Sequence, residues 1–413
     1  MMTETRITES DDGRTALIER PDGHGDADLM TVNMGPQHPS THGVLRVILT
    51  LDGETVVNAE PEIGYLHTGI EKTIQAKRYE AGLTCTDRMD YLSPLANNLA
   101  YCLAVEKLLE LPIPERATWL RMMLVELQRI ASHLVWLGTH ALDMGASTPF
   151  LYCFRERERV LDLFEELTGQ RLMTSYIRFG GVEQEVPDGW LGRVRDFVDE
   201  FPAHVDEYES LLTNNGIWRE RLIGVGVIGA EEAIAWGMTG PCLRGSGVDW
   251  DLRKKAPYCA YSELDFTVPV LTAGDCYSRY LCRVAEMRQS TRLVVQCLDR
   301  LPGGPIRSDN RKVVPPPKDE LSSSMESVIH HFKLLTEGMK PPIGEVYHAV
   351  ESPRGELGVY LVSDGTNKPR RCHVRAPSFA NLQALPRLCK GHLIADVVAI
   401  IGSIDIILGE IDR

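Results

Sequence analysis

The sequence lacks the features that mark several large classes of protein. Its ten cysteines include no CxxC pair, the usual first half of a zinc or iron–sulfur ligand set. It has no Walker loop, no GxGxxG before an expected strand-to-helix turn and no GxSxG elbow. With 58 acidic and 44 basic residues, the formal charge of -14 argues against a nucleic-acid partner. We therefore expect no thiolate-bound metal and no nucleic-acid site.

Long hydrophobic runs are missing too. The most apolar stretch, 393–409, contains Asp396 and Asp405 and is shorter than the roughly 20 apolar residues that cross a bilayer. The first thirty residues carry eight acidic side chains against three arginines, unlike a secretory or organellar leader. These patterns predict a cytoplasmic protein with reduced thiols, whose membrane association is at most peripheral.

What remains is the composition of a globular protein. Its 413 residues are 43% hydrophobic and 25% charged, enough for two or three packed subdomains. We expect an α+β fold with a central helix bundle and small antiparallel sheets near both ends. The predicted parts are a disordered acidic tail at 1–28, a β-hairpin region at 29–70, the helix bundle at 71–300, a proline-rich linker at 301–318, and a helix, β-hairpin and tail at 319–413.

Hydrophobic periodicity predicts the elements within these parts. Apolar residues alternate over 44–51, and Asp52-Gly53 before a second short strand predicts a hairpin with a two-residue turn. Alternation over 345–351 and 356–362 predicts a second hairpin. Helical periodicity predicts helices before Cys85, at 90–111, in a long segment opened by Pro114 and Glu115, and at 153–168, 190–213, 273–300 and 319–337.

Two short segments carry side chains suited to a ligand. The prolines and Gly43 in GPQHPSTHG predict a loop that can present His38 or His42, although two ordinary surface histidines are an equal alternative. In TDRMDYLS, capping of the following helix could explain Asp87 and Asp90. Tyr91 lies among apolar residues, so its phenol should seek a hydrogen-bond partner in a ligand or in the backbone.

The long helix carries a polar stripe. It comprises Glu126, Arg129, His133, His140 and Asp143. A solvent-facing side of an amphipathic helix would explain the stripe. However, apolar residues lie almost all round this helix, so we expect the polar residues to be buried and paired, Asp143 included.

Several long motifs, in order, then resemble one family. The sequence reads GPQHPSTHGVLR at 35–46, IGYLHTGIEK at 63–72, TDRMDYLS at 86–93 and THALDMGASTPF at 139–150. These motifs, and others through LIADVVAIIGSIDIILGEIDR at 393–413, resemble the 49-kilodalton subunit of respiratory complex I, the subunit of the quinone site. The resemblance spans residues 29–413 and implies a subunit of the proton-translocating NADH:quinone oxidoreductase, active only within the complex.

The resemblance implies roles for three residues. His42 and Tyr91 would donate hydrogen bonds to the quinone carbonyls, and Asp143 would pair with His42. Preorganised donors stabilise the negative charge that grows on a reduced quinone oxygen. An aspartate beside His42 would also favour the imidazolium and raise its pKa.

The family is related to the large subunit of nickel–iron hydrogenases, which implies a hydrogenase-like fold. Hydrogenases hold their metal with two CxxC pairs, whereas this chain reads Thr84-Cys85-Thr86 near the first pair and has no cysteine around Asp405. The resemblance therefore implies no cofactor bound by this chain alone. Electrons would come from a 4Fe-4S cluster in a neighbouring iron–sulfur subunit.

Two positions near that cluster depart from many relatives. Thr68 stands in place of an arginine and Met173 in place of a histidine. Fewer positive charges favour a lower-potential cluster, so menaquinone is expected rather than ubiquinone. Other peripheral-arm subunits and a membrane-arm subunit bordering the quinone channel are the further expected partners, at the cytoplasmic face of the bacterial plasma membrane.

Three alternatives remain open on the sequence. A hydrogenase-like catalytic subunit is opposed by the missing CxxC pairs. A docking scaffold between the iron–sulfur and membrane arms would need no site residues, yet His42, Tyr91 and Asp143 are all present. The same module could instead take electrons from a donor other than NADH.

Overall fold

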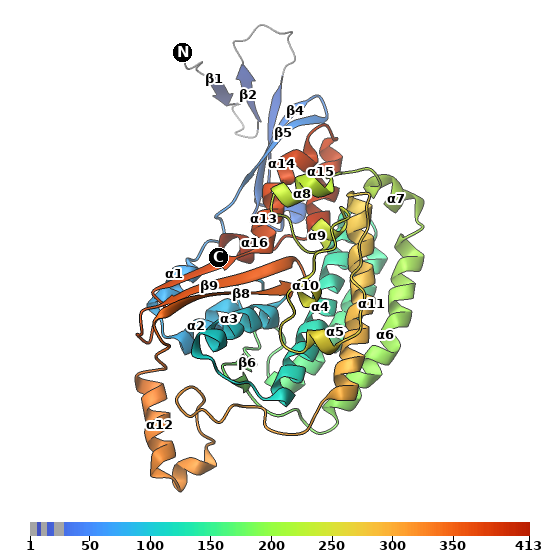
Figure 1. Cartoon of the computed structure of the whole chain (residues 1–413). Helices are drawn as coiled ribbons and strands as arrows, with labels where there is room; N and C mark the ends of the chain where they lie inside the picture. The colour runs from blue at the N-terminus through green and yellow to red at the C-terminus, as the bar shows by residue number, and fades with distance from the viewer. Residues whose placement is uncertain (1–5, 10–14, 20–28) are drawn as a thin grey trace.

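The structure is a computed structural model that describes residues 6–9, 15–19 and 29–413, with the side chains of 29–413. Helices dominate, and the strands of the described residues form three antiparallel sheets, so the predicted α+β class is confirmed (Figure 1). The helix bundle lies on one side of the molecule, with one sheet beside it and another at the end where the chain begins (Figure 1).

The first sheet is a meander of five strands in chain order. Its strands are β1 (Arg6–Glu9), β2 (Thr15–Glu19), β3 (Met30–Met34), β4 (Arg46–Asp52) and β5 (Thr55–Glu62). β1 and β2 differ from the expected disordered tail, and the other residues of 1–28 lie outside the described part. The β4–β5 hairpin is confirmed, but Asp52 pairs with Thr55, so its two-residue turn is Gly53-Glu54, one residue later than predicted.

Four long helices form the bundle. They are α4 (Glu115–Asp143), α5 (Ser147–Thr168), α6 (Trp190–Leu212) and α11 (Cys276–Arg300). α4 packs against α5 and α11 (Figure 1). Because apolar residues surround α4, its polar stripe is buried as predicted, with Glu126, Arg129, His133 and His140 at most 1% exposed. Asp143, at the end of the helix, is only half-buried.

The second sheet lies beside α3 (Pro94–Leu109) and has the order β10-β9-β8. Its strands are β8 (Gly344–Ser352), β9 (Gly355–Ser363) and β10 (Arg371–Arg375). The predicted hairpin is confirmed, with Ser352 paired to Gly355 around a Pro353-Arg354 turn. The turn carries Arg354 into the protein interior, where it is 0% exposed.

The shorter elements connect these parts. They are η1 (Pro39–Thr41), α1 (Ile70–Ala76), α2 (Tyr79–Thr86), β6 (Ile177–Arg178), β7 (Gly181–Val182), α7 (Gly216–Leu222), α8 (Ala230–Ala235), α9 (Pro241–Arg244), α10 (Leu252–Lys255), η2 (Tyr261–Glu263), η3 (Asp319–Ser322), α12 (Met325–Thr336), α13 (Pro377–Gln383), α14 (Leu385–Cys389), α15 (Ile394–Ile404) and α16 (Leu408–Asp412). The helix predicted at 319–337 is divided, because Ser324 caps a new helix by accepting a hydrogen bond from the Ser327 amide. Within the described residues, no helix combines the length and hydropathy needed to cross a membrane.

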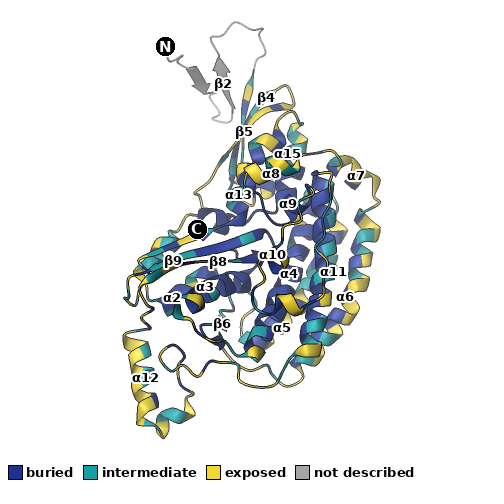
Figure 2. Cartoon of the chain, in the orientation of Figure 1, coloured by how far each residue is buried: buried dark blue, intermediate teal, exposed yellow. Residues whose placement is uncertain are grey.

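The region around α12 extends away from the body of the molecule. Pro315, Pro316 and Pro317 lead into it as irregular chain, as their fixed backbone angles predict. The outer side of α12 is exposed and includes apolar side chains such as Met325, at 76%, and Phe332, at 64% (Figure 2).

Candidate functional site

The loop before β4 is held in one compact turn. The His38 ring nitrogen accepts a hydrogen bond from the Ser40 amide at 3.2 Å, and the buried Thr41 hydroxyl donates to the His38 carbonyl at 3.0 Å. His42 follows in the left-handed region, at φ 56°, and its amide donates to the Pro39 carbonyl at 3.0 Å. The predicted loop is therefore a fixed turn that presents the His42 ring at its end.

His42 faces a carboxylate, but not the expected one. The residue is exposed as a whole, yet the surrounding protein still desolvates the imidazole and lowers its pKa. Asp405 and the backbone of Ile406 oppose this shift, whereas Arg354 adds to it. The nearby acid therefore raises the pKa of His42 in the expected direction, but desolvation outweighs it and the net shift is downward.

Asp143 instead lies near the beginning of the same turn. Burial raises the pKa of its carboxyl group, and the charge of His38 and a hydrogen bond from Ser40 oppose that rise. The groups that act on Asp143 in this structure are thus His38 and Ser40, and its pairing with His42 stays a prediction. The sequence spacing could not separate these possibilities, since both histidines belong to one short turn.

Neither acid of the 86–93 segment caps the helix that follows it. Helix α3 begins at Pro94, after both acids, and has Ser93 as its N-cap residue. Asp87 accepts a hydrogen bond from the Ser175 hydroxyl. Asp90 accepts one from the Leu92 amide at 3.0 Å and is 1% exposed. Its other oxygen forms an ion pair that organises the site.

Arg354 is the centre of that site. Its guanidinium donates to Asp90 at 2.9 Å, to the Ser132 hydroxyl at 2.6 Å and to Asp405 at 3.4 Å. The planar fork holds its donors in fixed directions and spaces them widely, whereas an ammonium group is a compact point charge with rotatable donors. Arg354 thereby joins the segment that carries Tyr91 to the acid that faces His42.

Two backbone approaches fix the position of Arg354. A Cβ atom added at Gly240 would lie 2.4 Å from the Arg354 carbonyl oxygen. A Cβ atom added at Gly355 would lie 2.7 Å from the Gly240 amide nitrogen, and both glycines have positive φ. Neither position accepts a larger side chain without displacement of the backbone. The two segments can therefore approach this closely only because both positions are glycines.

Tyr91 is half-buried beside this centre. Burial raises the pKa of its phenol, the Asp90 charge raises it further, and the Arg354 charge opposes both. Among residues 29–413, whose side chains are described, the Tyr91 hydroxyl has no hydrogen-bond partner. A phenol in this setting is available to donate to a ligand.

A third acid follows the α16 glycine that approaches the Tyr91 segment. Glu410 on α16 is 0% exposed, and one of its oxygens accepts hydrogen bonds from the hydroxyl and, at 3.4 Å, the amide of Ser378. A Cβ atom added at the preceding Gly409 would lie 2.6 Å from the Met89 carbonyl and 3.4 Å from the Tyr91 ring. Helix α16 is therefore in close contact with the Tyr91 segment.

Arg354, Asp405 and Glu410 were not predicted as site residues from the sequence. Two signals were present: an arginine inside a hairpin turn, and acids within the apolar run 393–409 and just after it. Both residue types are rarely buried without a partner, so their occurrence in apolar surroundings indicates an internal ion pair.

Thr68 and Met173 lie outside this centre. Thr68 is exposed, at the end of a loop whose Gly64 and Leu66 amides donate to Asp412 at 2.8 and 2.7 Å. Met173 is half-buried in the irregular chain before β6. Across the described part of the chain, no group of three or more His, Cys, Asp or Glu residues is placed to hold a metal ion.

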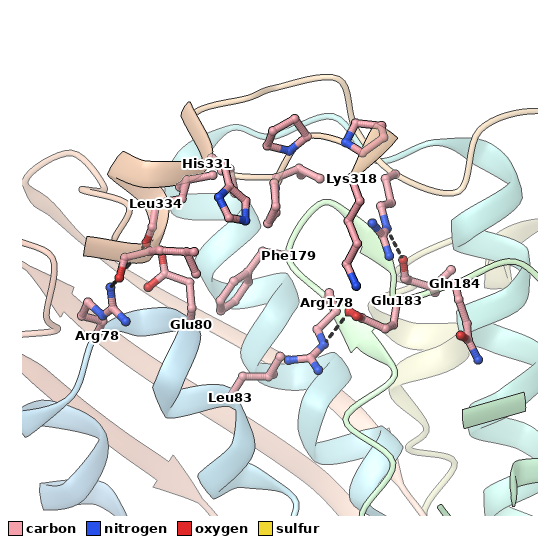
Figure 3. Close-up of a pocket in the computed structure, with 18 residues that line it drawn as sticks. Arg78, Glu80, Leu83, Arg178, Phe179, Glu183, Gln184, Lys318, His331 and Leu334 are labelled. Atoms are coloured by element: carbon pink, nitrogen blue, oxygen red, sulfur yellow. Dashed lines mark hydrogen bonds and ion pairs between the residues drawn. The ribbon is translucent and has the colours of Figure 1, made fainter. Parts of the chain in front are cut away.

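Two cavities differ in their relation to the site. One of about 780 Å³ lies between α12, the Pro315–Pro317 segment and the β6–β7 hairpin, with Arg178 paired to Glu183 at 3.1 Å in its wall (Figure 3). Another of about 680 Å³ is more open and is lined by 32–38, including His38, and by Ile394 and Val398. Only the second adjoins the turn that carries His42.

Comparisons with known proteins agree with one another. Residues 143–413 match the family described as the respiratory-chain NADH dehydrogenase 49-kilodalton subunit. The chain is 60% identical over 389 residues to an NADH-quinone oxidoreductase subunit of Koribacter versatilis, covering 94% of this chain and 97% of that protein. It is 57% identical over 415 residues to an NADH-quinone oxidoreductase subunit of Roseiflexus castenholzii, covering 100% of both. The chain therefore belongs to the family of the 49-kilodalton subunit of the respiratory-chain NADH dehydrogenase.

Proposed function

We propose that this chain forms the quinone headgroup site of a proton-translocating NADH:quinone oxidoreductase, together with an adjacent iron–sulfur subunit. One observation carries the proposal: Arg354 links the surroundings of the two candidate donors. It binds Asp90, which is next to Tyr91, and Asp405, the acid that acts on His42. Both side chains are partly open to solvent, while the charges that interact with them are buried.

Each donor has a distinct task in this proposal. Reduction places negative charge on the quinone oxygens, which hydrogen bonds from the imidazole and the phenol stabilise. Because the pKa of His42 is lowered, its neutral ring can donate a hydrogen bond but is a poor source of protons. Tyr91 is therefore the residue that passes one proton to a quinone oxygen, and the second proton that the quinol needs comes from solvent. Asp143 contributes indirectly, by holding the turn through His38 and Ser40.

The remaining components come from partner subunits. The electrons arrive from a 4Fe-4S cluster in the iron–sulfur subunit, and a membrane-arm subunit borders the route by which quinone enters. The chain lies with the other peripheral-arm subunits at the cytoplasmic face of the plasma membrane. Thr68 and Met173 lack the charge of arginine or histidine, which favours a lower cluster potential and hence menaquinone as the acceptor.

Tyr91→Phe tests the proposal in the assembled complex. The substitution removes one hydroxyl at nearly constant volume, so quinone reduction should fall about 10- to 1000-fold. NADH oxidation with an artificial acceptor upstream of the quinone should not change. Tyr152→Phe, at another half-buried tyrosine on α5, is the matched control. Equal loss of both activities would make Tyr91 structural and contradict the proposal.

The same preparation tests the electron donor and the quinone class. NADH must drive quinone reduction, since a complex that responds only to another donor would support the alternative module. A naphthoquinone acceptor should react faster than a benzoquinone of equal side-chain length. Faster reaction with the benzoquinone would contradict the assignment of menaquinone. Unimpaired quinone reduction in Tyr91→Phe would instead favour a docking scaffold.

A further inference from the structure

Helix α15 ends at the acid that binds Arg354. Asp405 follows the last residue of the helix in the left-handed region, at φ 52°, and accepts a hydrogen bond from Arg354 at 3.4 Å. The last carbonyl groups of a helix have no partner within that helix, so other groups must bind them where they are buried. Here the end of the helix is buried against the bundle, and the groups that bind its carbonyls determine where Asp405 lies.

Two buried side chains of the bundle bind these carbonyl groups. The Trp136 indole on α4 donates to the Gly402 carbonyl at 2.7 Å, and the Arg283 guanidinium on α11 donates to the Ser403 carbonyl at 2.8 Å. The guanidinium also lies over the indole ring, 4.6 Å from its centroid, in a cation–π contact. Trp136 and Arg283 therefore form one stacked unit, which we call the α15 clamp.

The contacts of the Asp405 side chain are longer than those of the clamp. Its carboxylate lies 3.4 Å from Arg354 and 3.7 Å from Arg283, beyond the usual length of a hydrogen bond. Among the residues whose side chains are described, its Oδ2 atom has no hydrogen-bond donor. Contacts of this length attract the carboxylate but do not fix its position. The short bonds to the backbone, at 2.7 and 2.8 Å, are therefore what hold Asp405 in place.

The same helix holds Arg354 and the end of α15. On α4, the Ser132 hydroxyl accepts a hydrogen bond from Arg354 at 2.6 Å, and Trp136 lies about one turn further along, on the same face. Helix α15 also packs directly against α4, since a Cβ atom added at Gly402 would overlap the His140 ring. Helix α4 is thus one element against which both partners of the ion pair are aligned.

We propose that the α15 clamp sets the position of Tyr91 in the quinone site, through Asp405 and Arg354. The clamp holds Asp405 against Arg354, and Arg354 binds Asp90, the residue before Tyr91, at 2.9 Å. The proposal rests on the function proposed above and adds two positioning residues to it. Neither side chain of the clamp touches the quinone, because both are buried. The competing explanation is that the two bonds only complete a helix end and stabilise the fold.

Trp136→Phe in the assembled complex tests the proposal, because it removes the indole N–H and keeps a ring beneath Arg283. Quinone reduction should fall about 10-fold, as a misplaced donor would cause. The fall should be in kcat, with KM for quinone little changed, since the donor acts on charge that grows during the reduction. NADH oxidation with an artificial acceptor should not change.

Trp190→Phe is the matched control. Trp190, at the beginning of α6, is 0% exposed, and its indole donates to the Leu163 carbonyl at 2.8 Å. Both substitutions therefore remove one buried indole–carbonyl hydrogen bond of nearly equal length, at a similar cost in stability. The bond of Trp190 joins α6 to α5 and does not involve α15, so Trp190→Phe should leave quinone reduction unchanged.

A double substitution separates positioning from a general loss of stability. Arg354→Lys removes the guanidinium fork and should itself slow quinone reduction about 10-fold. If the clamp acts through Arg354, the combination of Trp136→Phe with Arg354→Lys should be about as slow as Arg354→Lys alone. Independent effects would instead multiply, to about 100-fold.

Arg283→Lys provides a second variant should Trp136→Phe fail to assemble. It keeps a positive charge near Asp405 but loses the fork that binds the Ser403 carbonyl, so the same fall in kcat is expected. Arg121→Lys is its control, because Arg121 is also a buried arginine but joins α4 to Glu106 on α3, at 2.6 Å, rather than to α15.

The outcomes are distinct. Equal quinone reduction in Trp136→Phe and Trp190→Phe, or a double variant that shows the product of the two single effects, would overturn the role of the clamp. If Tyr91→Phe is impaired in the same assays, only this inference fails. If Tyr91→Phe also reduces quinone normally, the proposed function fails with it.

Discussion

At the scale of single residues, Arg354 determines the arrangement of the site. It is fully buried and interacts with acids from two distant segments, at Asp90 and Asp405. Buried ion pairs of this kind are weak evidence for stability, because desolvation offsets most of the attraction. Their geometry does, however, fix the relative positions of the residues that they join. We therefore expect a change at Arg354 to affect the site more than the fold.

Arg354→Lys should retain the positive charge but lose the fork. A single ammonium cannot contact Asp90, Ser132 and Asp405 with the same geometry. We expect assembly to be retained and quinone reduction to fall about 10-fold, which corresponds to about 1.4 kcal/mol. Arg370→Lys, at an exposed arginine just before β10, is the control. Wild-type quinone reduction in Arg354→Lys would show that the bridge does not position the donors.

Residue-scale inference from the sequence reached only part of this site. His42 and Tyr91 were predicted, and both interact with Arg354. The acid expected beside His42 was Asp143, whereas the structure has Asp405 there, because α15 ends where the His42 turn packs against it. Periodicity identifies faces of one element, but contacts between turns depend on how separate elements are packed.

At the scale of elements, short connections between regular segments position the site. The η1 turn, the turn before α3, the β8–β9 turn and α16 all contribute to it. Regular elements were predicted well: both hairpins and the long helices follow the hydrophobic periodicity, which depends on local sequence alone. The site could not be assembled in the same way, since its turns lie up to hundreds of residues apart.

Gly409→Ala tests the contact between α16 and the Tyr91 segment. The new methyl group would lie 2.6 Å from the Met89 carbonyl oxygen, a backbone atom that cannot move without displacing the turn. We expect a subunit that still assembles but reduces quinone about 10-fold more slowly, as a misplaced donor would. Gly303→Ala, where nothing lies within 4 Å of the added Cβ atom, should have no effect. Equal activities in the two variants would exclude a role for this contact.

At the scale of the whole molecule, a network of buried charges extends across the helix bundle. Glu126 on α4 pairs with Arg129 and with Arg253, each at 3.2 Å. Arg253 pairs with Asp251 at 2.7 Å, and Arg244 pairs with Glu351 at 2.7 Å, next to the β8–β9 turn. These pairs hold the bundle and the second sheet in one arrangement, and the same sheet carries Arg354.

The two cavities offer alternative positions for the quinone. The larger cavity, of about 780 Å³, lies away from His42 and Tyr91, between α12 and the β6–β7 hairpin (Figure 3). A quinone bound there would be bordered by Phe179 and Arg178 rather than by the proposed donors. Size alone favours this cavity, whereas the chemistry of proton donation favours the site around Arg354.

Covalent labelling of the assembled complex with a photoreactive quinone analogue tests the central claim most directly. We expect labelled peptides from this chain to contain residues of 35–46 or 88–93, and excess unlabelled quinone to prevent their labelling. Label confined to the peptides of the larger cavity, around Phe179 or Val314, would contradict the assignment of the quinone site to His42 and Tyr91.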